Sequence, residues 1–105
     1  MKQIKDFPDY YVTEDGKVFS YRWENKPREI KGGLMGKGGY KSVTLMIDNV
    51  KRKHFRTHRL VAENFVSGYF EGAVVNHKDG NKLNNHYSNL EWVTQQDNIK
   101  HYYGS

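Results

Sequence analysis

The sequence contains no cysteine. Disulfide bonds and thiolate zinc sites are therefore excluded, and the absence fits a reducing compartment. No apolar run approaches the roughly 20 residues that a membrane-spanning helix needs, and the Lys-rich start lacks the apolar stretch of a signal peptide. We therefore expect a soluble, cytoplasmic protein without a membrane partner.

Length and charge narrow the expectation further. The chain has 105 residues, 36% of them hydrophobic, which allows one compact domain with a modest core. Residues 1–60 contain 14 Lys and Arg against 7 Asp and Glu, whereas residues 61–105 contain 3 against 5. This basic excess beside aromatic residues favours binding to nucleic-acid phosphates, although a solvated basic surface would explain the same pattern.

The first hairpin signal lies near the start of the chain. Residues 10–13 and 17–21 have strand-like composition, and Gly16 between them provides the positive φ that a tight turn needs. Such a hairpin could cover the core, and it could also present basic side chains to DNA. These two roles are compatible, and the candidate DNA contacts are Lys17, Arg22 and Lys26.

A glycine-rich segment follows at residues 31–39. Five Gly in eight positions predict that this segment forms no regular element. Its main-chain N–H groups could approach a phosphate closely, or the segment could be a plain connector. It lacks the G-x-x-x-x-G-K-[ST] pattern of a nucleotide-binding loop.

A second hairpin is predicted from alternating residues. Residues 40–47 alternate like a strand, and residues 50–57 return after a turn at Asp48 and Asn49. Alternation places Arg52, His54 and Arg56 on one face. Such a ribbon fits a DNA groove, although edge strands also use basic residues against aggregation. Further DNA contacts are expected from Lys41, Lys51, Lys53 and Arg59.

Residues 58–65 predict a short linking helix. Val61 and Phe65 share one helix face and should pack on the hairpin that follows. His58, at the helix start, is better explained as a hydrogen-bonded structural residue than as a DNA contact. Residues 67–72 form a connector, with its two aromatic residues, Tyr69 and Phe70, expected to pack inward.

The last third of the chain predicts a strand, a long loop, a strand and a helix. The strands are expected at residues 73–75 and 90–93, separated by a loop rich in Gly and Asn. Thr94 is a helix N-cap signal, with an acidic residue three positions later, so a helix should span residues 95–103. A hairpin plus one helix buries little apolar surface, and a metal bound by oxygen and nitrogen ligands would hold these pieces together.

At this point the residues resemble a known family, the H-N-H endonucleases of the phage and intron homing type. The resemblance rests on Asn76 and His77, Asn89 at the second strand and Asn98 in the helix, with DGN and NN pairs in the loop. The segment FPDYYVTEDGKVFS is similar to the module that often precedes this nuclease, and HRLVAENF is similar to the joining segment. Together these motifs cover most of the chain.

The resemblance implies an α+β fold in one compact unit. Residues 1–57 would form a basic DNA-binding module of antiparallel β-hairpins or a small sheet, and residues 58–72 a linking helix and connector. Residues 73–105 would form a ββα-metal nuclease finger.

The resemblance also implies roles for the motif residues. His77 would be the general base that activates water, since histidine side chains have a reference pKa of about 6.5. Asn76 and Asn98 would bind a divalent metal, Mg²⁺ with Mn²⁺ as a substitute, because amide oxygens suit hard cations. Asn89 would be a structural residue of the site that ties down the loop and helps to orient the base.

Two further residues are candidates for an additional metal or phosphate contact. His101 follows Asn98 by three residues and shares its helix face, while Asp79 lies in the loop. The remaining loop Asn residues, Asn85 among them, are explained by loop architecture. His86 is expected to be exposed rather than catalytic.

The implied activity is metal-dependent hydrolysis of duplex DNA in the cytoplasm, which is the host cytoplasm if the gene is carried by a phage. A monomer would nick one strand, and a homodimer would break both; no small-molecule cofactor is expected. Asp or His often stands at the position of Asn76 in the family, so a non-cutting DNA-binding module is the alternative. A structural zinc domain is disfavoured because the histidines lack paired finger spacing.

Overall fold

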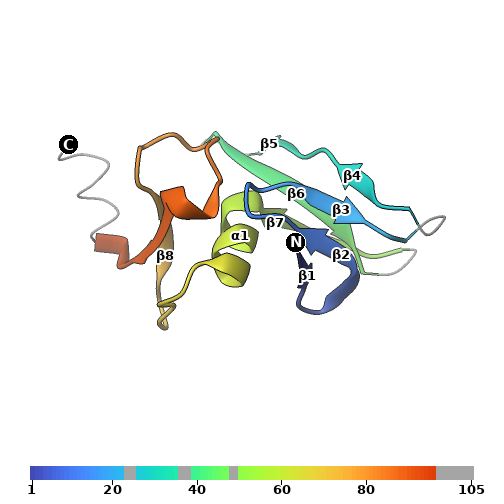
Figure 1. Ribbon diagram of the computed structural model, residues 1–105, viewed down its shortest axis with the longest axis horizontal. Helices are drawn as coiled ribbons and strands as arrows, with labels where there is room; N and C mark the ends of the chain where they lie inside the picture. Colours follow the sequence, from blue (N-terminus) through green and yellow to red (C-terminus); the bar gives the residue numbers. More distant parts are fainter. Residues whose placement is uncertain (23–25, 36–38, 48–49, 97–105) are drawn as a thin grey trace.

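The computed structural model describes residues 1–22, 26–35, 39–47 and 50–96. Its elements are antiparallel strands grouped in three sheets, with the helix α1 (Thr57–Phe65) between the two sheets of the first half and the last hairpin (Figure 1). The α+β class expected from the sequence is confirmed. No helix in the described part of the chain is long and apolar enough to cross a membrane.

The N-terminal sheet has four strands in the order β1-β2-β3-β4. The hairpin predicted around Gly16 is present as β2 (Phe7–Val12) and β3 (Val18–Ser20), and Gly16 has φ +90°. The sheet is extended by β1 (Lys2–Ile4) and β4 (Arg28–Ile30), which the sequence did not predict. Strands of three residues are too short to show an alternating pattern.

The second sheet corrects the expectation for the glycine-rich segment. It contains β5 (Gly33–Met35), β6 (Tyr40–Met46) and β7 (Arg52–Arg56), so a strand forms where no regular element was expected. The reason is a close approach of two backbones: a Cβ atom on Gly32 would lie 1.8 Å from the carbonyl oxygen of Ser42. Glycine permits this approach, so its presence here favours pairing with β6 instead of preventing it.

The core is shared by all parts of the fold. The buried face of α1 meets apolar residues from both N-terminal sheets and from the last hairpin. The helix therefore connects the basic first half of the chain to the last hairpin. The buried apolar residues are Ile4, Tyr10, Val12, Val18, Val43, Leu45, Leu60, Val61, Ala62, Ala73, Val75 and Leu90.

The connector before the last hairpin differs from the prediction in one respect. Tyr69 and Phe70 were expected to pack inward, but they are 57% and 42% exposed. The Trp92 side chain occupies the space beside this connector. Its indole N–H donates to the Val66 carbonyl at 3.0 Å and holds the ring there. Tyr69 therefore packs edge-on against the outside of Trp92, with ring centroids 5.0 Å apart.

The last hairpin consists of β8 (Val74–His77) and β9 (Leu90–Val93), as predicted, with His77 opposite Leu90. A 3-10 turn at Tyr87–Asn89 leads into β9. The helix predicted after Thr94 starts with helical residues Gln95 and Gln96, and the rest of it lies outside the described residues. The predictions for Asn98 and His101 lie there too.

Candidate active site

His77 is the last residue of β8 and lies at the centre of a cluster of rings. It is only 5% exposed, and its ring centroid lies 5.1 Å from that of His58 and 6.0 Å from that of Tyr40. The rings of Tyr40 and His58 are themselves 4.9 Å apart. Residues from β6, the start of α1 and the end of β8 thus meet at one point.

His58 is a neutral neighbour of His77. Burial lowers the pKa of His58 to about 3, and electrostatic interaction with His77, Arg56 and Arg59 acts in the same direction. Within the described residues, its Nδ1 atom is buried without a hydrogen-bond partner. His58 therefore packs against His77 as an uncharged ring at neutral pH, a structural role that does not use the hydrogen bond expected from the sequence.

Asn85 makes the polar contact to the His77 ring. The Oδ1 atom of Asn85 lies 2.8 Å from Nε2 of His77, and Asn85 is 4% exposed. The sequence had suggested that Asn89 helps to orient the base. Asn85 was explained by loop architecture alone, because nothing in a run of Asn residues indicates which one turns inward.

Asn89 closes the loop between the two strands. Its side-chain N–H groups donate to Asp79 and to the carbonyl of Asn84, both at 2.9 Å, and its Oδ1 accepts from the Asp79 N–H at 3.1 Å. Asp79 also accepts from the side chain of Asn84 and the backbone of Asn81. These hydrogen bonds, led by that of Asn84, lower the pKa of Asp79 and keep it ionised. Both residues hold the loop in shape.

Asn76 lies beside His77 in β8, and of the two main metal-ligand candidates, Asn76 and Asn98, it is the one within the described residues. It is 7% exposed and faces Glu91 across the hairpin. Its amide oxygen is a hard donor of the kind that Mg²⁺ accepts together with water and substrate phosphate. Within the described ranges, no three side chains of His, Cys, Asp or Glu form a group that could hold a metal ion by themselves. The donor chemistry therefore fits a cation that is shared with the substrate.

Positive charge gathers next to the ring cluster. The guanidinium carbon of Arg56 lies 4.8 Å from the centre of the Tyr40 ring, and Nζ of Lys82 lies 4.9 Å from it. Arg56 was a predicted DNA contact, whereas Lys82 was missed because a lysine in a loop has no distinguishing pattern. Tyr40 was also missed, since its distance in sequence from His77 hides their proximity.

The β6–β7 ribbon arranges its basic residues as alternation predicts. Arg52, His54 and Arg56 pair in register with residues of one face of β6, and the Thr44 hydroxyl lies 2.7 Å from Nδ1 of His54. Lys53 belongs to the alternate face, with its Nζ atom 5.4 Å from the centre of the Phe55 ring. The ribbon therefore directs its predicted DNA contacts to two faces.

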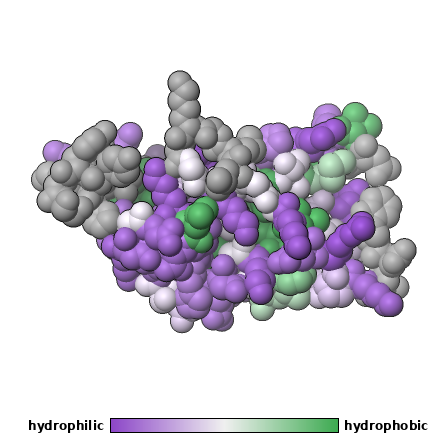
Figure 2. All heavy atoms as spheres, turned by 90° about the horizontal axis from the view of Figure 1, so that it is seen from above, coloured by the Kyte–Doolittle hydropathy of each residue, from purple (hydrophilic) through white to green (hydrophobic). Residues whose placement is uncertain are grey.

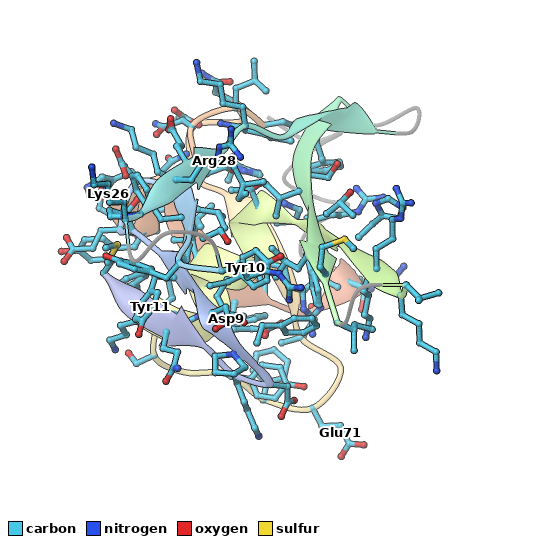
Figure 3. The ribbon with its side chains drawn as sticks, turned by 90° about the vertical axis from the view of Figure 1, so that its right-hand side faces the viewer. Asp9, Tyr10, Tyr11, Lys26, Arg28 and Glu71 are labelled. Carbon is cyan, nitrogen blue, oxygen red and sulfur yellow. The ribbon has the colours of Figure 1, made fainter. Side chains whose placement is uncertain are left out.

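The other basic candidates have acidic or aromatic partners of their own. Arg59 forms an ion pair with Glu63 at 2.9 Å and lies over Trp92. Arg22 lies 3.8 Å from Asp9, and Lys17 lies 4.0 Å from Asp15. Figure 3 places Tyr10 near the middle of the view and Lys26 at its left edge. In the view of Figure 2, most of the coloured surface is hydrophilic, with a few hydrophobic residues among it.

Comparisons with known proteins agree with this arrangement. Residues 55–100 match the family described as HNH endonuclease. The chain is 43% identical over 100 residues to the DNA endonuclease I-HmuI of Bacillus phage SP01, which covers 94% of this chain and 55% of that protein. It is 40% identical over 104 residues to the uncharacterised HNH endonuclease L245 of Acanthamoeba polyphaga mimivirus, covering 95% of this chain and 28% of that protein.

A solved structure is also similar to this fold. It is described as DNA binding and cleavage by the HNH homing endonuclease I-HmuI, and it matches with a TM-score of 0.83 over 94% of this chain and 55% of that one. The chain thus spans about half the length of I-HmuI. The resemblance to the H-N-H endonucleases is therefore confirmed: residues 55–100 match the model of that family, and the chain is similar over most of its length to H-N-H endonucleases.

Proposed function

We propose that this chain is an endonuclease that uses a divalent metal to hydrolyse phosphodiester bonds in duplex DNA, with His77 as the general base. One observation carries the proposal: a buried histidine, held by Asn85, lies in a ring cluster whose outer ring, Tyr40, is flanked by Arg56 and Lys82. A proton acceptor and cations that can bind phosphate thus meet in one place. The DNA cleavage described for I-HmuI supports the same substrate.

Each of the proposed site residues has a distinct role in hydrolysis. His77 takes the proton of the attacking water, and the hydrogen bonds of Asn89 keep the loop around it in shape. Arg56 and Lys82 hold the DNA backbone near this histidine, and Arg52 extends the contact along the ribbon. A divalent cation, held by Asn76 and Asn98, would stabilise negative charge on the phosphate and the leaving oxygen.

The alternative function is DNA binding without cleavage. It is favoured by Asn76, because a neutral amide binds a divalent cation more weakly than the carboxylate often found at this position. The ring cluster and the ribbon would then be kept for folding and for binding. The two functions differ in whether DNA is cut.

Incubation with supercoiled plasmid decides between these functions. We expect Mg²⁺ or Mn²⁺ to support conversion to the nicked form and EDTA to stop it. A monomeric protein should accumulate nicked plasmid, whereas a homodimer should also yield linear plasmid early in the reaction. Binding in a gel-shift assay without cleavage in either metal would favour the alternative.

The metal role of Asn76 can be tested by adding charge. Asn76→Asp places a carboxylate beside the proposed cation, so less Mg²⁺ should be needed for half-maximal cleavage, whereas Asn76→Ala should require more. Binding of Mn²⁺, followed by electron paramagnetic resonance with uncleavable DNA, should change in the same order. The control is Asn81→Asp, which adds the same charge at an exposed loop position. Equal metal dependence in all four proteins would remove Asn76 from the metal site.

A further inference from the structure

The hydrogen bond between Asn85 and His77 determines which nitrogen of the histidine carries the proton. A carbonyl oxygen can only accept a hydrogen bond, so Nε2 of His77 must donate to Oδ1 of Asn85 across their 2.8 Å separation. In a neutral imidazole only one nitrogen is protonated. Nδ1 of His77 then carries the lone pair and is the atom able to take a proton from water.

The ring neighbours of His77 do not determine which of its two nitrogens carries the proton. Tyr40 and His58 lie against the imidazole at tilts of 31° and 51°, and contacts between ring faces do not distinguish its two nitrogens. Burial strengthens the effect of Asn85, because His77 and Asn85 are 5% and 4% exposed and water has little access to compete for the bond. The tautomer therefore depends on one amide.

Asn85 is itself held by the N-terminal hairpin and by the start of α1. A Cβ atom placed on Gly16 would lie 2.9 Å from Cβ of Asn85 and 3.2 Å from a methyl group of Thr57. The N–H of Tyr87 donates to the carbonyl of Glu14 at 2.8 Å, which ties the loop to the same turn. The turn beside Gly16 thus packs directly against the residue that contacts the base.

We propose that Asn85 is a positioning residue that holds His77 as the Nε2–H tautomer, and that the N-terminal hairpin turn fixes Asn85 in this position. The inference rests on the proposed function in one respect, since it treats His77 as the general base. It gives the N-terminal module a second task. Besides carrying basic residues, the module keeps the base in the form that can accept a proton.

Nitrogen NMR of the histidines tests the bond without relying on cleavage. In ¹⁵N-labelled protein at a pH of about 8, above the reference pKa of a histidine side chain of about 6.5, two-bond correlations distinguish the tautomers. The His77 signal, identified by its absence in His77→Gln, should show a protonated Nε2. Asn85→Leu keeps the branched shape and the number of side-chain heavy atoms but has no acceptor, so it should give a mixture of tautomers. Asn85→Asp retains an oxygen acceptor and should restore the Nε2–H form.

Kinetics with the same variants should follow the tautomer. We expect Asn85→Leu to lower kcat on saturating DNA by roughly 10-fold to 100-fold, the usual range for loss of a residue that orients a site ligand, with Kd for DNA unchanged. Asn85→Asp should recover most of the rate. The matched control is Asn81→Leu, the same substitution in the same loop at an exposed position without contact to His77. If Asn85→Leu does not fold, Asn85→Ser, whose side chain is too short to reach the ring, replaces it.

The possible results separate this inference from the proposed function. A protonated Nδ1 in the parent protein, or an Asn85→Leu variant with the parental tautomer and kcat, would overturn the role of Asn85. A parent protein that shows the Nε2–H tautomer but never cuts plasmid would refute the endonuclease proposal while leaving the bond in place.

Discussion

Replacement of His77 by alanine should lower the rate of DNA cleavage by roughly 10²-fold to 10⁴-fold, the range expected for loss of a general base. DNA affinity should change little, because the Arg and Lys side chains that would hold the backbone remain. The rate is measured at saturating DNA and metal. Added imidazole should restore part of the activity, since it can diffuse to the vacated position and accept the proton.

A second histidine of the same loop region provides the control. His86 caps the 3-10 turn by accepting the N–H of Ser88 at 3.2 Å, and its ring packs on Tyr87. It has no contact with His77 among those described, so His86→Ala should leave the cleavage rate nearly unchanged. A His77→Ala protein that is folded and cuts at the parental rate would remove His77 from the mechanism.

The parts of the fold that the sequence predicted are those with a strong local signal. The β6–β7 hairpin alternates over many residues, and Gly16 occupies a position whose φ of +90° favours glycine. The strand β5 was missed because glycine was interpreted only as a source of flexibility. The contact between Gly32 and Ser42 forms only when β5 pairs with β6, and composition alone does not show that glycine permits this pairing.

The residues of the candidate site likewise differ in whether the local sequence indicates them. His77 and Asn76 could be named from the sequence because the family resemblance concerns a short motif, and His77 proves to be buried among aromatic rings. Tyr40, His58 and Asn85 were not assigned to the site, since their contacts with His77 exist only after three separate elements have packed together. A motif can thus indicate the proposed reacting group, whereas the residues that contact it are determined by tertiary structure.

The ring cluster lies where the basic first half of the chain meets the acidic second half. The first half of the chain carries the basic excess, while the proposed base lies in the acidic second half. Tyr40 and Arg56 belong to the first half and reach the His77 cluster from β6 and β7. DNA bound along the ribbon would therefore extend to the base without any rearrangement of the described elements.

Affinity for duplex DNA should consequently depend steeply on salt. If about six cations contact phosphates, affinity should fall by roughly 10³-fold between about 50 and 200 mM salt. Arg52→Ala and Arg56→Ala should each weaken binding and flatten the slope of log affinity against log salt by about 0.9. Fluorescence anisotropy at several salt concentrations measures both quantities. Lys5→Ala removes the same charge from the turn between β1 and β2 and should leave the slope unchanged. An equal effect of all three substitutions would mean that net charge, and not the β6–β7 ribbon, holds the DNA.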